Sequence, residues 1–453
     1  MIANPCYTTI TLYGQSYLLP FGQALADKCA VLQVNDTVLT ILKECRVEIE
    51  ESALLATLCD TYLPSDSEKE DFLNDIKECI SDLKAAGVLW DAPTGGSGSL
   101  VGGPDAPAGR VASPADRMDS LSPVPYEGTA PSAVLTIAGI SISLWIPEEV
   151  LNRKFSDFCL TQNSLTDSGF ADSEFSDDRA VTGFRVTLAD SSEISSLADT
   201  YAGFHKVLVS PDLTVLEDEA CFLLHYPAFR YLSYAKICKE TGDTVFFFTG
   251  LPADGSVMIS PQIPEEFYQA LRLPFLYTAC RTDVLMLHSA SFLYKGKVYC
   301  ISAPAHTGKS THVNYWVKEF GVPVINGDLN LLTLSHCDVK DNITDTVSAD
   351  QILVQGTPWC GTSGVADSGA YPFGGVLFLE QADRDFVTFL SPRDAALLLI
   401  SRSINPAFWE KMLQKRARVA RILAGSDAVF GLLHATNSPA SAHAAKDYID
   451  GVL

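Results

Sequence analysis

The feature that most constrains the fold is a strand, a loop and a helix in immediate succession, KGKVYCISAPAHTGKSTHVNYWVKEFG in residues 295–321. Val298–Ser302 is a short apolar strand, and Thr311–Phe320 continues as a helix. The loop between them fits the pattern Ala/Gly-x-x-x-x-Gly-Lys-Ser/Thr, in which successive backbone N–H groups at a helix start surround phosphate oxygens. The segment therefore predicts an α/β domain that binds nucleotide phosphates.

The residue types of this loop suggest individual roles. Lys309 is expected to neutralise the β- and γ-phosphates, and the Ser310 hydroxyl to hold Mg²⁺. Asp328, at the end of the apolar segment VPVINGDLNLL, is a candidate for a second metal-binding carboxylate. An idle glycine turn before a helix would not explain Lys309, Ser310 and Asp328 together. The predicted nucleotide-binding residues are Ala303, Pro304, Ala305, His306, Thr307, Gly308, Lys309, Ser310 and Thr311.

Two nearby segments offer further candidates. His288 lies in the apolar stretch LMLHSASFLYKG before the loop, and a lone histidine of this kind is either catalytic or structural. Downstream, GTPWCGTSG is a Gly-rich segment with small hydroxyl residues, which either closes over a substrate or only connects two elements. Its candidate substrate residues are Trp359, Cys360, Gly361, Thr362 and Ser363.

If the bound nucleotide donates a phosphoryl group, cations beyond Lys309 are needed, because charge develops on the transferred group. Arg281, Arg393 and Arg402 lie near the motifs in sequence. Each is either a phosphate clamp or a solvated surface arginine. The basic stretch KMLQKRARVAR is either a solvated helix face or a surface for an acidic peptide.

A Gly-, Pro- and Ser-rich stretch divides the chain. Residues 91–130 are poor in large apolar side chains and cannot bury enough surface to offset their ordering entropy, so we expect a flexible linker, with a long ordered loop as the alternative. The linker separates a domain at 1–90 from a body at 131–453. Within the body, AVLTIAGISISLWI and TVFFFTG predict a β-rich lead-in.

The composition of the chain argues against several classes of binding partner and of metal or redox site. Lys and Arg number 32 and Asp and Glu 55, so the formal charge is −23, which argues against nucleic-acid and anionic membrane surfaces. No apolar run is long enough to span a membrane, and the first basic residue is Lys28, so we expect a cytoplasmic protein. The 12 cysteines include no CxxC pair, which gives no support for a zinc or dithiol site.

The first 90 residues predict three strands followed by three helices, a winged-helix-like module. TTITLYG, QSYLLP and AVLQV are the strands, and the helices are expected at Thr37–Cys45, Glu50–Tyr62 and from Ser67 to Ala86. Ser65 and Glu68 form a capping-box pattern, and Gly87 is placed to end the last helix. Phe72, Ile76, Ile80 and Leu83 share one face of that helix. Its many Asp and Glu side chains argue against a DNA-binding winged helix.

This order, with YLLPFGQALADKCAVLQVNDTVLTILKEC and DLKAAGVL, resembles the PqqD-like recognition domains of ribosomal peptide biosynthesis over about Tyr7–Trp90. In that family a precursor's leader peptide adds as a strand to a sheet edge beside the last helix. The resemblance implies a leader-binding site at Val31, Leu32, Gln33, Val34, Phe72 and Ile76.

LHSASF, APAHTGKST, INGDLNLL and GTPWCGTSG together resemble the HPr-kinase-like proteins, whose nucleotide domain is related to phosphoenolpyruvate carboxykinase. The resemblance is good from about Leu273 to Ile400. It implies an α/β (α+β overall) kinase that uses ATP and Mg²⁺, with His288, Lys309 and Asp328 catalytic and Ser310 and Asp328 on the metal. One departure is Gly327-Asp328, where the family usually has two consecutive acidic residues. The proton acceptor is therefore either His288 or Asp328 acting through water, or the reaction proceeds without a dedicated proton acceptor.

We therefore expect a kinase that phosphorylates a Ser or Thr hydroxyl of a ribosomal precursor peptide recruited through its leader. A kinase of another protein or of a small molecule, and a nucleotide-binding adaptor without chemistry of its own, remain alternatives. HPr kinases commonly assemble as oligomers, so the resemblance also leaves a homo-oligomer open.

Overall fold

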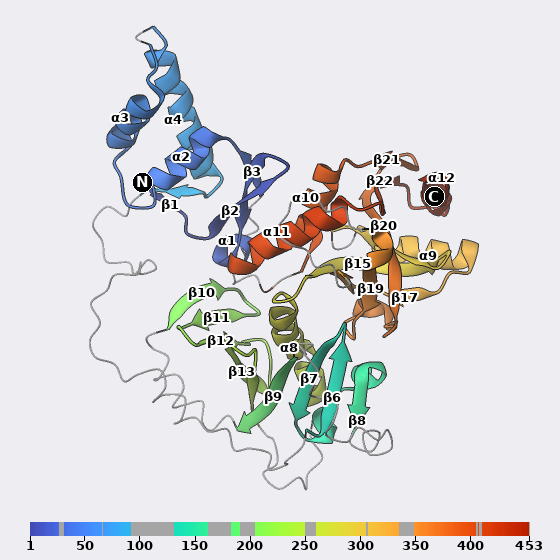
Figure 1. Ribbon diagram of the computed structural model, residues 1–453. Helices are drawn as coiled ribbons and strands as arrows, with labels where there is room; N and C mark the ends of the chain where they lie inside the picture. Colours follow the sequence, from blue (N-terminus) through green and yellow to red (C-terminus); the bar gives the residue numbers. More distant parts are fainter. Residues whose placement is uncertain are drawn as a thin grey trace. The chain divides into compact units, whose positions relative to one another are not determined.

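The computed structural model describes residues 1–26, 31–65, 67–91, 131–161, 183–190, 204–249, 260–304, 307–334, 348–404, 406 and 410–452. The linker predicted at 91–130 lies outside this part of the chain, apart from Asp91. Helices combine with large mixed sheets, which confirms the expected mixed α/β class (Figure 1). The chain forms two compact units, each of which is described by itself.

The first unit contains the N-terminal strands and helices. A three-stranded antiparallel sheet has the order β2-β3-β4. A second, separate pair joins β1 to β5. The strands are β1 (Ile2–Ala3), β2 (Tyr7–Leu12), β3 (Gln15–Pro20), β4 (Leu32–Val34) and β5 (Leu89–Trp90).

Three helices of this unit form close to where the sequence predicts them, and the short helix α1 was not predicted. Asn35 caps the first of the three through a hydrogen bond of 3.0 Å from Val38 N to its side chain. Ser65 Oγ donates to Glu68 at 2.5 Å, although the helix itself begins at Lys69. Gly87 has a φ of 72°, as expected of a left-handed helix end. The helices are α1 (Gly22–Ala26), α2 (Asp36–Glu44), α3 (Glu51–Tyr62) and α4 (Lys69–Ala85).

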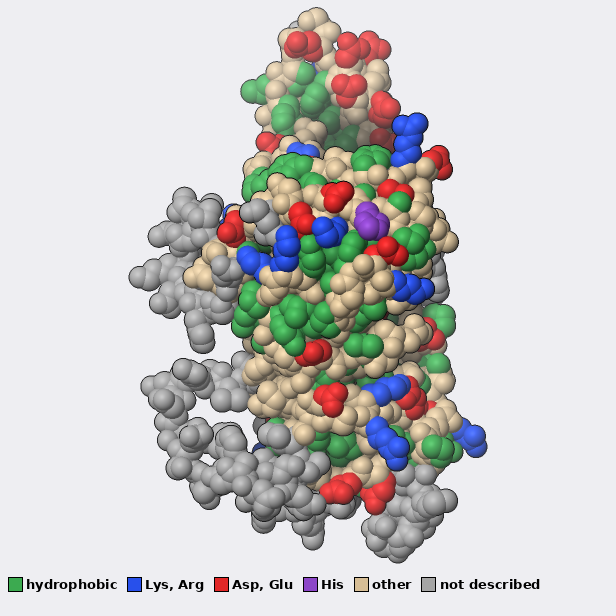
Figure 2. Space-filling view, turned by 90° about the vertical axis from the view of Figure 1, so that its right-hand side faces the viewer, with side chains coloured by type: hydrophobic (Ala, Val, Ile, Leu, Met, Phe, Trp, Pro, Cys, Tyr) green, Lys and Arg blue, Asp and Glu red, His purple; other side chains and the backbone are tan. Residues whose placement is uncertain are grey.

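Helix α4 is amphipathic, with one face in the core and the other in solvent. Ile76, Ile80 and Leu83 are buried, and Phe72 packs against the same cluster. The opposite side is acidic, and Asp and Glu side chains gather over the helices of this unit in Figure 2. The exposed acidic residues are Glu68, Glu70, Asp71, Asp75, Glu78 and Asp82.

One short strand from far along the chain also belongs to the first unit. β10 (His205–Val209) packs against α1, and Val209 N donates to the side chain of Gln23 at 2.9 Å. The sequence contains no signal for this contact, because the linker and the first strands of the β-rich lead-in separate the two segments.

The second unit begins with the predicted β-rich lead-in. Its strands pair in the order β11-β12-β13-β14-β9-β7-β6-β8, with both parallel and antiparallel neighbours. The strands are β6 (Ala133–Ile137), β7 (Ile140–Trp145), β8 (Cys159–Thr161), β9 (Gly183–Asp190), β11 (Thr214–Glu217), β12 (Cys221–His225), β13 (Leu232–Cys238) and β14 (Thr244–Phe248).

A further sheet carries the phosphate-loop motif. Its order is β16-β15-β18-β19-β20-β22-β21, β17 pairs with β15, and an additional pairing of β16 with β20 joins strands distant in that order. The strands are β15 (Val284–Tyr294), β16 (Lys297–Ser302), β17 (Val324–Asn326), β18 (Leu329–Leu334), β19 (Ile352–Gly356), β20 (Ala370–Gln381), β21 (Phe386–Phe389) and β22 (Val429–Ala435).

Helices flank this sheet. α9 packs against β15 and β16 and against α12. The end of α10 lies beside β15. Ile404 N, just past the helix, donates a hydrogen bond of 2.8 Å to the carbonyl of Met286 in β15. α11 contains residues of both units. The helices of this part are α8 (Gln262–Ala279), α9 (Lys309–Phe320), α10 (Pro392–Arg402), α11 (Glu410–Ala424) and α12 (Ala440–Val452).

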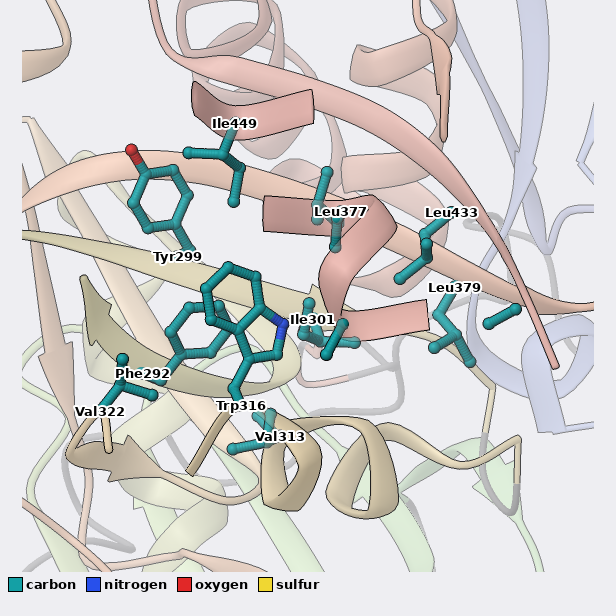
Figure 3. Packing of buried hydrophobic residues seen from close by; sticks show 14 of the residues in the cluster. Phe292, Tyr299, Ile301, Val313, Trp316, Val322, Leu377, Leu379, Leu433 and Ile449 are labelled. Carbon is teal, nitrogen blue, oxygen red and sulfur yellow. The ribbon is translucent and has the colours of Figure 1, made fainter. Parts of the chain in front are cut away.

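A buried aromatic cluster fixes α9 to the sheet. Trp316 of α9 is fully buried and stacks on Phe292 of β15, with ring centroids 4.2 Å apart (Figure 3). Val313, Ile301 and Leu377 surround the pair. Because an aromatic side chain in such a core contributes several kcal/mol, this packing holds the start of α9 in place.

Candidate functional site

Strand pairing brings His288 and Asp328 together. The first part of β15 pairs with β18 up to His288↔Leu329, and the rest pairs with β16 from Ser289↔Ser302 onward. His288 therefore lies where the pairing with β18 ends and the pairing with β16, on the other edge of β15, begins. Asp328 directly precedes β18, and its carbonyl accepts a hydrogen bond of 2.9 Å from Ser289 N. As a result, His288 Nε2 lies 3.2 Å from Asp328 Oδ1.

The phosphate loop starts beside this pair. Ser302, the last residue of β16, donates through Oγ to the His288 carbonyl at 2.8 Å. Ala303 is buried, which leaves little space for a larger side chain there. Gly308 has a φ of 111° at the start of α9, a conformation that favours glycine. The loop therefore turns at Gly308 and presents the first N–H groups of α9.

Lys309 is held inside the loop rather than extended into solvent. Its side chain is buried, and Nζ donates to the carbonyls of Ala303 at 3.0 Å and Pro304 at 3.2 Å. Ser310 and Thr311 follow in the first turn of α9 and are exposed. Gln381, at the end of β20, donates to the Thr307 carbonyl at 3.4 Å. The remaining predicted loop residues, Ala305 and His306, lie outside the described part of the chain.

Charges converge on Asp328. Burial acts to raise the pKa of its carboxyl, but the hydrogen bond from His288 and the charges of Arg272 and Lys309 outweigh it, so the pKa is lowered. Burial lowers the pKa of Lys309, the charge of Asp328 opposes this, and that of Arg402 adds to it. Asp328 is thus a charged carboxylate among cations.

The charges of two arginines act on the residues of this site. Arg402 ends α10, and the next residue, Ser403, bridges to Leu287 beside His288. Burial lowers the pKa of its guanidinium. Arg272 of α8 acts on Asp328 and was not predicted from the sequence, since nothing in α8 resembles a motif.

The other candidate arginines lie elsewhere. The Arg281 guanidinium lies near Gly242, at the turn between β13 and β14. Arg393 is next to Asp394 at the opposite end of α10 from Arg402, with Nε 3.4 Å from the carboxylate. Of the three arginines predicted from sequence proximity, the structure brings only Arg402 to the phosphate loop.

The segment GTPWCGTSG divides into a buried half and an exposed half. Trp359 Nε1 donates to the Tyr268 carbonyl at 2.9 Å, and Tyr268 OH donates to the Pro358 carbonyl at 2.9 Å. Trp359 and Cys360 are therefore part of the core, whereas Thr362 and Ser363 are exposed. The backbone at Gly361 approaches Asp328 so closely that a Cβ there would lie 3.0 Å from Asp328 Cβ.

The same segment explains the glycine before Asp328. A Cβ at Gly327 would overlap the Ser363 side chain and lie 2.8 Å from the Cys360 carbonyl oxygen. Side chains larger than hydrogen are therefore excluded unless this segment moves. The site has one carboxylate at this position because a second one does not fit.

A buried amide network orients Asp328. Asn326 Oδ1 accepts from Asp328 N at 2.8 Å and from Leu329 N at 3.0 Å, while its Nδ2 donates to the Thr357 carbonyl at 2.7 Å. Asn330 Nδ2 similarly donates to the Ser289 carbonyl at 2.7 Å. Sequence analysis missed both asparagines. The sequence signal that could have identified them was the presence of two polar side chains inside the apolar segment VPVINGDLNLL, because buried polar groups are usually hydrogen-bonded.

The predicted metal ligands are compatible with magnesium. Mg²⁺ keeps several waters and is usually bound by one or two protein oxygens together with substrate phosphates. Asp328 supplies a carboxylate whose side chain is 26% exposed, and Ser310 supplies an exposed hydroxyl at the start of α9. Within the described ranges, no group of three or more His, Cys, Asp or Glu side chains is placed to hold a metal ion by itself.

In the first unit, the predicted leader-binding residues differ in exposure. β4 lies at the edge of its sheet, beyond which the described residues place no further strand. Val31 is 39% exposed and Gln33 is exposed, whereas Leu32, Val34 and Phe72 are half-buried. Ile76 is 3% exposed and packs in the core, so it supports this surface from beneath.

Comparisons with known proteins assign the chain to no family. No protein-family model matches the chain, and no curated protein matches it. Among the described residues, no helix is both long and apolar enough to cross a membrane.

Proposed function

We propose that the protein is an ATP- and Mg²⁺-dependent kinase that phosphorylates a Ser or Thr hydroxyl of a ribosomal precursor peptide. The observation that supports this most is the His288–Asp328 pair, at the point where β15 stops pairing with β18, together with the buried side chain of Lys309, whose charge acts on Asp328. In this proposal the second unit is of the HPr-kinase and phosphoenolpyruvate-carboxykinase type, and the first unit is a PqqD-like recognition domain.

The phosphate loop holds the donor. Lys309 is already ordered by the Ala303 and Pro304 carbonyls, and these neutral groups leave its positive charge available to the phosphates. Ser310 and Asp328 would hold Mg²⁺, which neutralises charge on the β- and γ-phosphates when bound. Because phosphoryl transfer depends mainly on positioning and charge stabilisation, this arrangement supplies its main requirements.

The His288–Asp328 pair supplies the proton acceptor. With Nε2–H donating to the Asp328 carboxylate, the imidazole is held in the tautomer whose Nδ1 is basic. The acceptor oxygen forms a bond to the γ-phosphorus, the bond from that phosphorus to the bridging oxygen of ADP breaks, and the hydroxyl proton passes to Nδ1. A single carboxylate can then serve the metal while histidine takes the proton.

The experiment uses the full chain with Mg²⁺, ATP and a short precursor peptide encoded beside its gene. Intact-mass measurement should show a gain of about 80 Da, the mass of one phosphoryl group transferred in place of a hydroxyl proton. Asp328→Asn should abolish this gain without changing binding of the peptide. An unchanged peptide mass with the wild-type protein would contradict the proposal.

A matched pair of variants tests the first unit. Val31→Asp places a charge at the exposed sheet edge, whereas Val47→Asp makes the same change at a valine that is 70% exposed outside the strands and helices. Strand addition depends on main-chain pairing and on apolar contacts at the edge. We expect Val31→Asp to weaken peptide binding and Val47→Asp to leave it unchanged. Equal effects would contradict leader recognition at β4.

One observation favours a second candidate function. Because Gly327 leaves no space for a second carboxylate, the chain also fits an adaptor that binds nucleotide and precursor without transferring phosphate. Peptide-dependent formation of ADP would exclude the adaptor.

A further inference from the structure

Two cysteines of the β-rich lead-in lie directly opposite each other on neighbouring strands. In the antiparallel pairing of β12 with β13, Cys221 is the partner of Cys238, and both thiols are free. A third cysteine of the same sheet, Cys159, has Leu135 as its partner instead. Strand pairing thus brings together two thiols that are far apart in the sequence and belong to no CxxC motif.

The backbone hydrogen bonds show which kind of antiparallel pair the two cysteines form. Cys238 N donates to the Asp243 carbonyl at 2.9 Å, on the side away from β12. The neighbouring pair makes the bond between the strands, since Lys239 N donates to the Ala220 carbonyl at 2.8 Å. Hydrogen-bonded and non-hydrogen-bonded pairs alternate along a ladder. Cys221 and Cys238 are therefore a non-hydrogen-bonded pair, the type with the shorter Cα separation, about 4.5 Å.

The two cysteine side chains lie on the same face of the sheet. Side chains alternate between the faces of a strand, so Cys221 shares its face with His225, and Cys238 shares its face with Tyr234. His225 and Tyr234 are partners in the same register, and their rings stack with centroids 4.7 Å apart. Paired side chains on this face therefore meet. A Cα separation of about 4.5 Å also lies within the range of disulfides.

The two thiols differ in access to solvent. Cys221 is 3% exposed, and burial, with the charge of Asp218, raises the pKa of its thiol to about 12. Cys238 is half-buried, so it is the thiol that a reagent reaches first. The Cβ atoms of opposite residues are usually about 4.5–5.5 Å apart, more than the roughly 3.8 Å of a relaxed disulfide. A bond between these strands is therefore strained and easily reduced again.

We propose that Cys221 and Cys238 are a modification site that forms a reversible disulfide by exchange with a small-molecule disulfide. The Cys238 thiolate attacks one sulfur of the small disulfide and releases the other as a thiolate. The Cys221 sulfur then attacks the Cys238 sulfur, which forms the S–S bond and releases the second thiolate. The protons of the two cysteines pass to these leaving groups, so the protein loses two electrons and the small disulfide gains them. The site does not depend on the proposed kinase function.

The test treats the folded full chain with oxidised glutathione, blocks the remaining thiols with N-ethylmaleimide and identifies linked peptides by mass spectrometry after proteolysis. We expect a pair of peptides joined through Cys221 and Cys238, with a maleimide label on neither. Reduction with dithiothreitol before labelling should restore both labels. Cys159→Ala is the matched control, because it removes a half-buried cysteine whose strand partner is Leu135, and it should still form the bridge.

Two single variants separate the bridge from general thiol reactivity, with the unfolding temperature as a check on the fold. In Cys221→Ala, Cys238 should retain glutathione as a mixed disulfide, because the partner thiol is missing. In Cys238→Ala, Cys221 should stay unmodified, because it is buried. Wild-type chain with glutathione on Cys238 and no bridge, or with labels on both cysteines, would overturn the proposal. An equal yield of the bridge in urea would also overturn it, because the unfolded chain no longer holds the strands in register.

Discussion

The two sides of Asp328 are built in different ways. The phosphate side comes from one continuous segment, in which β16, the loop and α9 follow each other over residues 297–320. The other side combines α8, the turn before β18 and the segment from Pro358 to Ser363, which are far apart in the sequence. The first side has a recognisable motif because its spacing is local. The second exists only once the sheet has formed, and its residues can change without altering the motif.

The largest expected effect is on the phosphate side. Lys309→Ala removes the buried ammonium group, and we expect peptide phosphorylation to fall by about 10³-fold or more, since charge stabilisation carries most of such a transfer. The measurement is the initial rate of phosphopeptide formation, with the unfolding temperature as a check on the fold. Gln381→Ala, which removes only a bond to the Thr307 carbonyl, should lower the rate far less. Similar losses in both variants would contradict the role of Lys309.

The next effect concerns the residue between the two sides. His288→Ala removes the proposed proton acceptor, and the rate should fall by about 100-fold, the lower end of general-base effects. His288→Gln, which retains a donor toward Asp328 but no base, should be equally slow. If either variant loses only a few-fold in rate, His288 is structural and the proton goes elsewhere.

A smaller effect is expected at Arg402. Arg402→Ala removes a cation near Lys309, and kcat should fall by about tenfold, as for one hydrogen bond to a charged group. Arg393→Ala is the matched control at the other end of the same helix and should leave kcat unchanged. Equal changes in the two variants would show that α10 acts through its overall charge alone.

The glycine before Asp328 tests how closely the two sides fit. Gly327→Asp restores the second acidic residue of HPr kinases, but its side chain overlaps Ser363 and Cys360. We expect a loss of about 1–3 kcal/mol in the free energy of unfolding, as for an overpacked site, and no gain in rate. Ser363→Gly in the same chain should recover part of the stability. A stable and faster Gly327→Asp protein would show that the segment moves freely.

The pH dependence should be the smallest of these effects. The pKa of Asp328 is lowered from 3.8, and that of Lys309 is lowered from 10.5. A carboxyl with a lowered pKa in the folded state stabilises the fold above its unfolded pKa and loses this contribution as pH falls through the folded pKa. Asp328→Asn should therefore flatten the decline of unfolding free energy with falling pH below about 4. As pH rises, loss of the proton from Lys309 should lower the rate, and this loss should begin at a pH below 10.5 because the pKa of Lys309 is lowered. An identical acid profile for Asp328→Asn would contradict the lowered pKa.

Much of the fold follows from local sequence patterns. The helix at Glu51–Tyr62 begins one residue after the predicted start, and the last helix of the first unit buries the predicted apolar face. The strand before the phosphate loop and the helix after it also form as expected, because their signals are periodic and short-range.

Other features depend on contacts that no local pattern contains. The charge of Arg272 in α8, a helix that packs on Trp359 through Phe275, lowers the pKa of Asp328, and β10 joins the first unit from within the β-rich lead-in. Trp359 and Cys360 were candidates for a substrate loop, with a connecting loop as the alternative, and the structure buries both, with Trp359 packed against Tyr268 and Phe275. Whether an aromatic residue in a Gly-rich segment faces a ligand or the core depends on which helix packs over it.

The most direct test of the central claim measures ADP and phosphopeptide in one reaction of the full chain with ATP, Mg²⁺ and the precursor peptide. If the His288–Asp328 pair and Lys309 transfer the γ-phosphoryl group, the two products should form in equal amounts, only when peptide is present, and both should disappear in Lys309→Ala. Binding of ATP and peptide without either product, or ADP formed at the same rate without peptide, would contradict the account.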